Sequence, residues 1–201
     1  MLKSRTFVFD VDGCLADFIL GFTTLAHKYD TTIPFYSTYQ QKVWGQFSGM
    51  TAKQEDDTWK IVDNDTQFWE NLEPLGDYVE WERLKDLHAV STIYFATSRR
   101  GIDPRGQTIN FLEKQGIYRP QVIVTSMKGI FCKCVRAKYA IDDKADNAQA
   151  IAWIAEWQGG RTVPYILDRP YNRYNDLIIG SKHVVRTYSL GGFLDACFTV
   201  L

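Results

Sequence analysis

Two aspartates separated by a single residue follow an apolar run near the start of the chain. The segment Phe7–Gly13 reads Phe-Val-Phe-Asp-Val-Asp-Gly, which places Asp10 and Asp12 at the carboxyl end of a predicted strand. Unpaired carboxylates are costly to bury, and a bound cation would remove that cost. Mg2+ prefers oxygen ligands and commonly takes one or two carboxylates together with waters and a phosphate oxygen. An ordinary Asp-Gly turn is the alternative interpretation of the same residues.

Polar side chains recur at the ends of three later apolar runs. Thr97 and Ser98 follow the second run, and two hydroxyls beside backbone N–H groups suit a phosphate. Lys128 follows the third run and can neutralise an anionic phosphate as a point charge. Asp142 and Asp143 end the fourth run. Each feature alone has an ordinary turn or surface explanation, but together they predict acids, hydroxyls and a cation along one edge of one sheet.

The apolar runs that carry these residues predict the strands of a parallel sheet covered on both faces, because their hydrophobicity is nearly continuous. We predict strands over Thr6–Asp10, Ser91–Ala96, Gln121–Thr125, Tyr139–Asp142 and Val163–Leu167. We predict helices from Pro104 to Gln115, capped by Asp103 and stopped at Gly116, over Ala145–Trp157, and after Ser189. This alternation indicates a doubly wound α/β fold, in which ligands bind at the carboxyl ends of the strands.

The stretch from Asp17 to about Leu75 is longer than one crossover between strands needs. It predicts helices over Phe18–Tyr29, around Gln40–Phe47 and over Ala52–Ile61. We therefore predict a catalytic core made of residues 1–16 and 76–201, with a helical cap inserted over residues 17–75. The cap is rich in aromatic side chains, which either form its own small core or, in one or two cases, face a ligand. They include Phe18, Phe22, Phe35, Tyr36, Tyr39, Trp44, Phe47, Trp59, Phe68 and Trp69.

Composition excludes several classes of function. The 201 residues suit one domain with a small insertion. Lys and Arg number 23 against 24 Asp and Glu, so the net charge of −1 gives no global attraction to DNA or RNA. No stretch approaches the roughly 20 apolar residues of a membrane span, and the first residues lack a signal-peptide core. Four cysteines without zinc-site spacing (Cys14, Cys132, Cys134 and Cys197) predict reduced thiols in a cytoplasmic protein.

Taken in order, the four strand-end motifs resemble those of the haloacid dehalogenase-like (HAD) phosphohydrolases. The longer segments Asp10–Phe18 and Gln67–Pro74 are similar to those of the 5′(3′)-deoxyribonucleotidases. Leu167–Arg173 is similar to a segment that bacterial and phage-type members carry. The resemblance implies a Rossmann-like core with a helical cap after the first motif. It also implies a Mg2+-dependent phosphatase that acts through an aspartyl-phosphate.

The resemblance assigns a role to each strand-end residue. It makes Asp10 the nucleophile and a metal ligand, and Asp12 the general acid and then the base, with its backbone carbonyl on the metal. Thr97 and Lys128, with Ser98 beside them, would hold the phosphoryl group. Asp143 is the implied metal ligand of the fourth motif, with Asp142 next to it. Phe18 and Trp44 correspond to aromatic residues of the nucleotide pocket.

Several positions depart from the family pattern or leave a choice open. Cys14 stands where Thr or Val is usual, and Asn147 stands where many relatives have Asp. Lys133 and Lys138 are rivals of Lys128 for the role of the phosphate-binding lysine. Arg99, Arg100 and Arg105 either orient an anionic substrate or form a solvated cluster, which is the commoner case, and the polar loop 168–173 either flanks the site or is only a turn.

The leading functional hypothesis is a nucleotidase that acts on small nucleoside monophosphates, with the deoxy forms favoured. A HAD-type phosphatase on a sugar phosphate or a polynucleotide end is the enzymatic alternative, and near-neutral charge weakens the polynucleotide version. A binding module without activity is a third hypothesis, although neither the nucleophile nor the lysine is missing. No membrane partner is expected, and a homodimer stays open.

Overall fold

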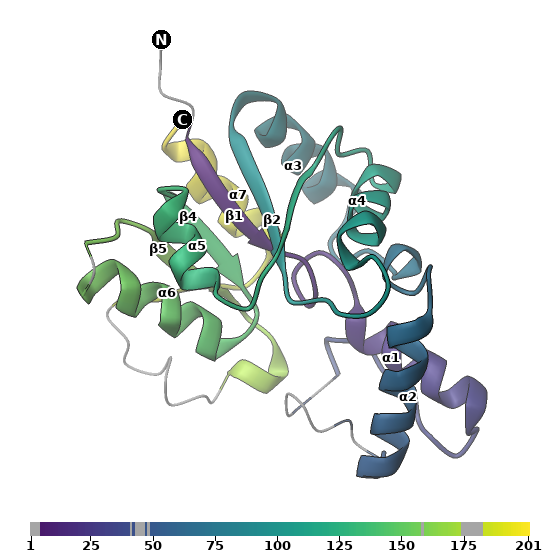
Figure 1. Ribbon diagram of the computed structural model, residues 1–201. Helices are drawn as coiled ribbons and strands as arrows, with labels where there is room; N and C mark the ends of the chain where they lie inside the picture. The colour runs from purple at the N-terminus through teal and green to yellow at the C-terminus, as the bar shows by residue number, and fades with distance from the viewer. Residues whose placement is uncertain (1–4, 41, 43–46, 48, 158, 174–182) are drawn as a thin grey trace.

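A six-stranded parallel sheet forms the centre of the molecule. The computed structural model describes residues 5–40, 42, 47, 49–157, 159–173 and 183–201 (Figure 1). Within these ranges the sheet has the strand order β3-β2-β1-β4-β5-β6, and every neighbouring pair is parallel. The strands are β1 (Thr6–Asp10), β2 (Thr92–Thr97), β3 (Gln121–Val124), β4 (Tyr139–Asp142), β5 (Val163–Leu167) and β6 (Val185–Thr187). The predicted doubly wound α/β fold is confirmed.

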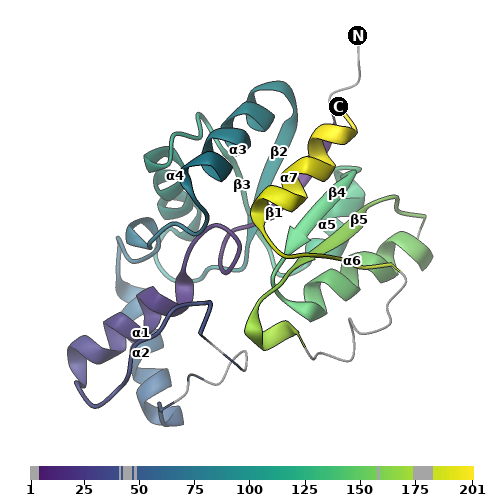
Figure 2. The same cartoon turned by 180° about the vertical axis from the view of Figure 1, so that it is seen from behind.

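Helices cover both faces of the sheet, as the two opposite views show (Figures 1 and 2). On one face α3 (Tyr78–Val90) packs against α7 (Leu190–Thr199). Phe111 of α4 (Pro104–Lys114) lies in the same hydrophobic cluster as Phe9 and Phe193. On the other face α5 (Lys128–Cys134) packs against α6 (Ala145–Trp157), over a second cluster that includes Val8. Burial on both sides explains the continuous hydrophobicity of the strands.

Local capping explains where several helices begin. Asp103 accepts a hydrogen bond from the backbone N–H of Gly106 at 2.9 Å, and Ser189 accepts one from Gly192 at 3.1 Å, so both predicted N-caps are confirmed. Helix α3 was not predicted, although the Asp77 and Glu80 side chains form a reciprocal capping box at its start. The seven-residue α5 and the three-residue β6 were not predicted either, because such short elements carry little periodic signal.

The inserted segment contributes α1 (Phe18–Tyr29), α2 (Ala52–Asn64) and the short 3₁₀ helix η1 (Trp69–Asn71). Helices α1 and α2 project together beyond the carboxyl ends of the strands (Figure 1). The chain leaves and re-enters the core side by side, because Asp17 N donates to Glu73 O and Leu75 N donates to Leu15 O, both at 2.8 Å. We call residues 17–75 the cap, and its separation as a domain stays a prediction. The predicted helix around Gln40–Phe47 falls mostly outside the described residues.

Two further expectations concern membrane-spanning helices and the state of the cysteines. Across the described ranges, every helix is too short or too polar to cross a membrane. All four cysteines are free thiols, with Cys134 exposed and Cys14, Cys132 and Cys197 buried. The prediction that these thiols are unpaired is therefore confirmed.

Candidate active site

The parallel register brings the acids of β1 and β4 together. Phe9 pairs with Ile141 in neighbouring strands, so Asp10 emerges beside Asp142 at the carboxyl edge of the sheet. Lys128, the first residue of α5, lies between the two acids, with its Nζ at 2.7 Å from both Asp10 Oδ1 and Asp142 Oδ2. All three side chains are at most 5% exposed. The result is a buried cation shared by two carboxylates.

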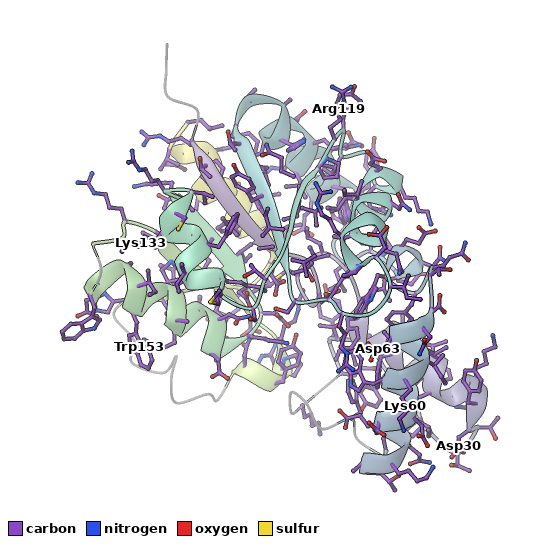
Figure 3. All side chains as sticks on the ribbon, viewed as in Figure 1. Asp30, Lys60, Asp63, Arg119, Lys133 and Trp153 are labelled. Carbon is purple, nitrogen blue, oxygen red and sulfur yellow. The ribbon has the colours of Figure 1, made fainter. Side chains whose placement is uncertain are left out.

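The two rival lysines lie elsewhere. Lys133 is exposed on α5, on the side of the molecule away from the cap helices (Figure 3). Lys138 comes just before β4, so it lies at the opposite edge of the sheet, where its Nζ stands 5.4 Å from the centre of the Tyr139 ring. Lys128 is therefore the lysine that the fold places among the acids.

Burial and charge set the electrostatics of this cluster. Burial raises the pKa of Asp10 well above its usual range, and repulsion from Asp142 adds to the rise against the attraction of Lys128. Burial alone would lower the pKa of Lys128, but Asp10 and Asp142 outweigh it, so the pKa of the ammonium lies above its ordinary value. Lys128 stays charged, and the site favours further positive charge near Asp10.

The structure gives the two acids of the fourth motif different environments. Asp142 is saturated with donors, because besides Lys128 it accepts hydrogen bonds from the backbone N–H of Lys144 at 2.9 Å and from Asn147 Nδ2 at 3.0 Å. Asp143 accepts a hydrogen bond from the Tyr171 hydroxyl on Oδ2. Its Oδ1 is buried and has no hydrogen-bond partner among the described residues. We predicted both acids in the metal site, but the geometry turns Asp142 to Lys128 and leaves Asp143 available.

Candidate ligands for a divalent cation lie together at Asp143. Asp10, Cys14 and Asp143 each offer one ligand atom, and these atoms lie within 4.8 Å of one another. The orphaned Oδ1 of Asp143 is a buried acceptor that a cation would satisfy, and carboxylate oxygens suit Mg2+. Burial, then repulsion from Asp142, raises the pKa of Asp143 to about 6. Burial, then Asp143, raises the pKa of Cys14 well above its usual range, so its sulfur is a neutral thiol.

The close contact between the loop after β1 and Asp143 requires glycine at position 13. Gly13 has a φ of +81°, in the left-handed region that side chains disfavour. A Cβ built there would stand only 2.1 Å from Asp143 Oδ2. The first loop can therefore close over Asp143 only because residue 13 has no side chain.

Asp12 has its own buried partner, which corrects the expectation for Arg99. Arg99 is 4% exposed rather than solvated, and it binds Asp12 through Nη2–Oδ1 at 2.8 Å and through Nε at 3.1 Å to both carboxylate oxygens. Trp69 and Phe111 cover the guanidinium, with ring centres 5.0 and 5.6 Å from Cζ. Two aromatic faces replace the water that an arginine would otherwise keep.

The predicted phosphate-binding hydroxyls are also engaged. Thr97 Oγ1 donates to Asp12 Oδ2 at 3.1 Å, so it belongs to the Asp12 cluster in this structure. Ser98 is exposed at the mouth of the site, and its Oγ donates to Thr125 O at 3.1 Å. Arg105 lies away from the acids, because its Nε donates to Val122 O at 3.2 Å.

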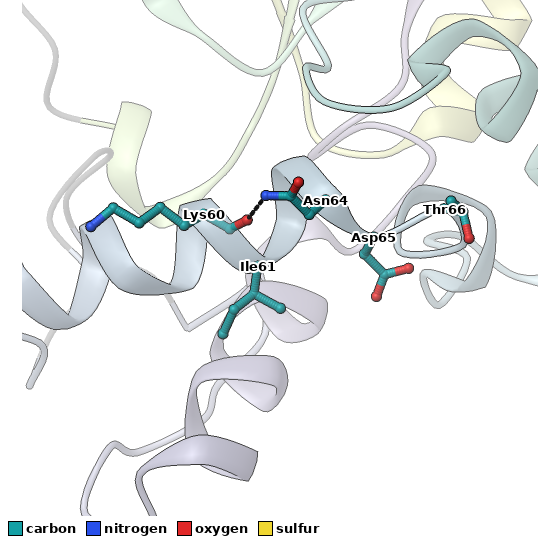
Figure 4. A pocket seen from close by; sticks show the side chains of 5 residues that line it. All are labelled: Lys60, Ile61, Asn64, Asp65 and Thr66. Carbon is teal, nitrogen blue, oxygen red and sulfur yellow. Dashed lines mark hydrogen bonds between the residues drawn. The ribbon is translucent and has the colours of Figure 1, made fainter.

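A cavity of about 180 Å³ joins the strand ends to the cap. Its lining combines charged groups of the core with aromatic rings and one acid, Glu55, of the cap. It is lined by Asp10, Asp12, Phe18, Phe47, Glu55, Trp59, Trp69, Ser98, Arg99, Arg100, Lys128 and Lys144. A wider hollow at the end of α2, lined by Lys60, Ile61, Asn64, Asp65 and Thr66, contains none of the strand-end residues (Figure 4). We therefore place the candidate site in the smaller cavity.

Phe18 lies at the centre of the aromatic side. Its ring stacks against Trp59 and against Trp69, with centroids 5.5 Å away in both cases and planes within 27°. The edges of Phe47 and Phe68 also contact it, so the ring forms part of the cap core as well as the cavity wall. Sequence reasoning missed Trp59 and Trp69 as wall residues, and aromatic enrichment was the only signal for them. The other predicted pocket residue, Trp44, lies outside the described residues.

The cap is attached to the core beside this cavity. Arg100, after β2, forms an ion pair with Asp63 of α2, and its guanidinium carbon lies 5.1 Å from the centre of the Trp59 ring. Trp69 Nε1 donates to Arg100 O at 2.8 Å. A Cβ at Gly101 would stand 2.8 Å from the Asp63 backbone, so the two segments approach closely. In this structure, these contacts hold the aromatic residues of the cap beside the strand β2 that precedes Arg100.

Comparison with known proteins identifies the class of fold. No protein-family model matches the chain, and no curated protein matches it. Among solved structures, a HAD family hydrolase from Deinococcus radiodurans with bound phosphate and sodium has a TM-score of 0.54 at 14% identity, covering 96% of this chain and 94% of that chain. A beta-phosphoglucomutase from Thermotoga maritima has a TM-score of 0.55 at 14% identity, covering 98% and 100%.

The HAD-hydrolase YfnB from Bacillus subtilis, bound to magnesium, has a TM-score of 0.56 at 16% identity, covering 98% of this chain and 99% of that chain. Such low identities establish the fold alone. The chain has the Rossmann-like α/β fold of the haloacid dehalogenase-like hydrolases.

Proposed function

We propose that this protein is a Mg2+-dependent phosphatase that hydrolyses nucleoside monophosphates, with deoxynucleotides favoured, through an aspartyl-phosphate on Asp10. The observation that carries the proposal is the buried cluster of Asp10, Lys128 and Asp143, of which Asp10 and Lys128 line a cavity that aromatic side chains of the cap also line. Phosphoryl transfer depends on positioning and on neutralised charge, and this cluster offers both. The fold is one that phosphoryl-group enzymes share, which supports the proposal without deciding the substrate.

Asp10 is the proposed nucleophile. A carboxylate oxygen of Asp10 attacks phosphorus, and the bond from phosphorus to the ester oxygen breaks. Lys128 holds Asp10 through Oδ1 and brings positive charge to the phosphoryl group. Asp10 and Asp143 would hold Mg2+, with the Asp12 carbonyl, and the ion would reduce the repulsion between the phosphate and the attacking carboxylate. Burial raises the pKa of Asp10, and added positive charge beside it would favour the ionised form.

Asp12 is the proposed proton carrier. Its carboxyl group protonates the alkoxide that leaves and then accepts a proton from the water that hydrolyses the aspartyl-phosphate. Arg99 and Thr97 fix the orientation of Asp12 towards the cavity through Nη2–Oδ1 at 2.8 Å and Oγ1–Oδ2 at 3.1 Å. Inorganic phosphate and the nucleoside are the products.

The aromatic wall supports a substrate with a flat base. Stacking on an aromatic side chain contributes roughly 1–3 kcal/mol per base in nucleic-acid-binding proteins. Trp59, which is half-buried, and Phe47 line the cavity from the cap. The volume of about 180 Å³ is below the roughly 300 Å³ at which ligand pockets begin, so we propose that the cap moves when a nucleotide binds.

A substrate panel tests the proposed function. Phosphate release would be measured with and without Mg2+ for deoxynucleoside and ribonucleoside monophosphates, sugar phosphates, a 3′-phosphorylated oligonucleotide and p-nitrophenyl phosphate. We expect EDTA to abolish release, Mg2+ to restore it, and deoxynucleotides to give the highest kcat/KM. A preference for sugar phosphates or oligonucleotide ends would replace the nucleotidase by the corresponding phosphatase. No release from any substrate would favour the binding module.

A further inference from the structure

The loop after β5 contacts Asp143, and none of its described residues lines the cavity. Within the short helix η2 (Pro170–Asn172), the Tyr171 hydroxyl donates a hydrogen bond to Asp143 Oδ2. Asn172 Nδ2 donates to the backbone carbonyl of Asp143 at 2.8 Å and to Leu167 O at 2.7 Å. One residue of the loop therefore holds the Asp143 side chain, and its neighbour holds the backbone.

The same loop also holds the first motif. Arg169 Nε donates to Gly13 O at 2.8 Å, and the Arg169 side chain is buried. A Cβ at Gly13 would stand 2.9 Å from the Tyr171 hydroxyl and 2.1 Å from Asp143 Oδ2, so three segments meet at this point. The loop therefore fixes Asp143 relative to Gly13, and Asp10 lies three positions before Gly13 in the chain.

The loop is itself anchored to the sheet. Asp168 accepts hydrogen bonds from Arg173 and from Arg186, which precedes Thr187 at the end of β6, both at 2.8 Å. Asn172 Oδ1 also accepts from Arg186 at 2.9 Å. A loop held in this way can impose an orientation on the groups it binds.

We propose that Tyr171 is a positioning residue that orients Asp143 for a divalent cation. Its hydrogen bond occupies Oδ2 and leaves Oδ1 as the buried oxygen without a protein partner, in the cluster with Asp10. Without the hydroxyl, Asp143 can rotate and lose the alignment of Oδ1. The proposal rests on the proposed metal site, but it concerns cation affinity and can be measured without substrate.

The test is the Kd of Mg2+, and in parallel of Mn2+, measured by titration calorimetry on the whole wild-type protein and on Tyr171→Phe. The variant keeps the ring and removes only the hydroxyl. Loss of a group that orients a metal ligand typically weakens metal binding roughly 10–100-fold, and we expect that loss here. Tyr165→Phe on β5 is the matched control, because the Tyr165 ring packs on Phe193 away from Asp143. The control should bind Mg2+ as the wild type does.

Thermal melting without metal separates positioning from folding. We expect the Tm of metal-free Tyr171→Phe to stay close to that of Tyr165→Phe, while only the former loses cation affinity. An unchanged Kd in Tyr171→Phe, or an equal change in both variants, would overturn the role of Tyr171 and leave the phosphatase proposal standing. Absence of cation binding in the wild type would overturn the metal site and this proposal together.

Discussion

Truncation of Phe18 separates two roles that the structure combines in one side chain. Phe18 is 4% exposed, stacks on two tryptophans and also lines the cavity. Replacing a buried Phe by Ala typically costs about 3–5 kcal/mol. Each kcal/mol lowers Tm by about 2–4 °C in a protein of this size, so Phe18→Ala should melt about 6–20 °C lower. The loss of the cavity wall should also lower kcat/KM for deoxynucleoside monophosphates by about tenfold, which corresponds to about 1.4 kcal/mol.

Phe22 provides the matched control for this measurement. It lies one helical turn after Phe18, is fully buried, and packs against Phe47 and Trp59 at 4.4 and 4.9 Å between centroids. It does not line the cavity. Phe22→Ala should therefore lose a similar amount of stability but keep the wild-type ratio of kcat/KM for a deoxynucleotide to kcat/KM for p-nitrophenyl phosphate.

The assay combines melting curves with both substrates, at a temperature where each variant is folded. We expect the substrate ratio to fall in Phe18→Ala alone. If the ratio falls equally in both variants, Phe18 acts through the cap core and not through the substrate. If neither Tm changes, the packing that the structure shows around the two rings is wrong.

Three other predictions concern the acids and thiols. Asp12→Asn should slow hydrolysis of nucleotides more than that of p-nitrophenyl phosphate, whose leaving group needs little protonation, and equal losses in kcat would exclude the acid role. Burial raises the pKa of Asp143 to about 6, so the metal-free folded protein keeps a proton that the unfolded chain loses near pH 4. In EDTA, the free energy of unfolding should therefore fall between pH 4 and 7 in the wild type by about 3 kcal/mol more than it does in Asp143→Asn. Parallel profiles of unfolding free energy against pH, measured by urea denaturation, would contradict this. Iodoacetamide at neutral pH should label exposed Cys134 first, because burial raises the pKa values of Cys14 and Cys132, and peptide mapping that finds Cys14 labelled first would refute the geometry of the first loop.

Much of the fold could be predicted because local patterns decide it. The strands β1, β4 and β5 begin and end where the apolar runs do, and Asp103 and Ser189 carry their capping signal in single residues. The convergence of Asp10, Lys128 and Asp143 also follows from sequence, because parallel strands place their carboxyl ends at one edge. Local pattern was therefore enough for the features that depend only on where each parallel strand ends.

The remaining features depend on contacts between distant segments. Arg99 looked like a surface arginine because nothing near it in sequence shows that Trp69 and Phe111 cover it. The different environments of Asp142 and Asp143 depend on Lys128 of α5 and Tyr171 of η2, which come from distant segments of the chain. The packing of the Phe18 ring could not be predicted either, because it stacks on Trp59 and Trp69. These residues lie 41 and 51 positions further along the chain.

The most direct test of the central claim is to trap the phosphorylated protein. Wild-type protein and Asp10→Asn would be mixed with a deoxynucleoside 5′-[32P]monophosphate and Mg2+, quenched in acid within a single turnover, and mapped by peptide digestion. We predict that the label is found on the wild-type peptide that contains Asp10 and is absent from Asp10→Asn. Release of labelled phosphate without labelled protein, or label on another peptide, would contradict the aspartyl-phosphate mechanism at this residue.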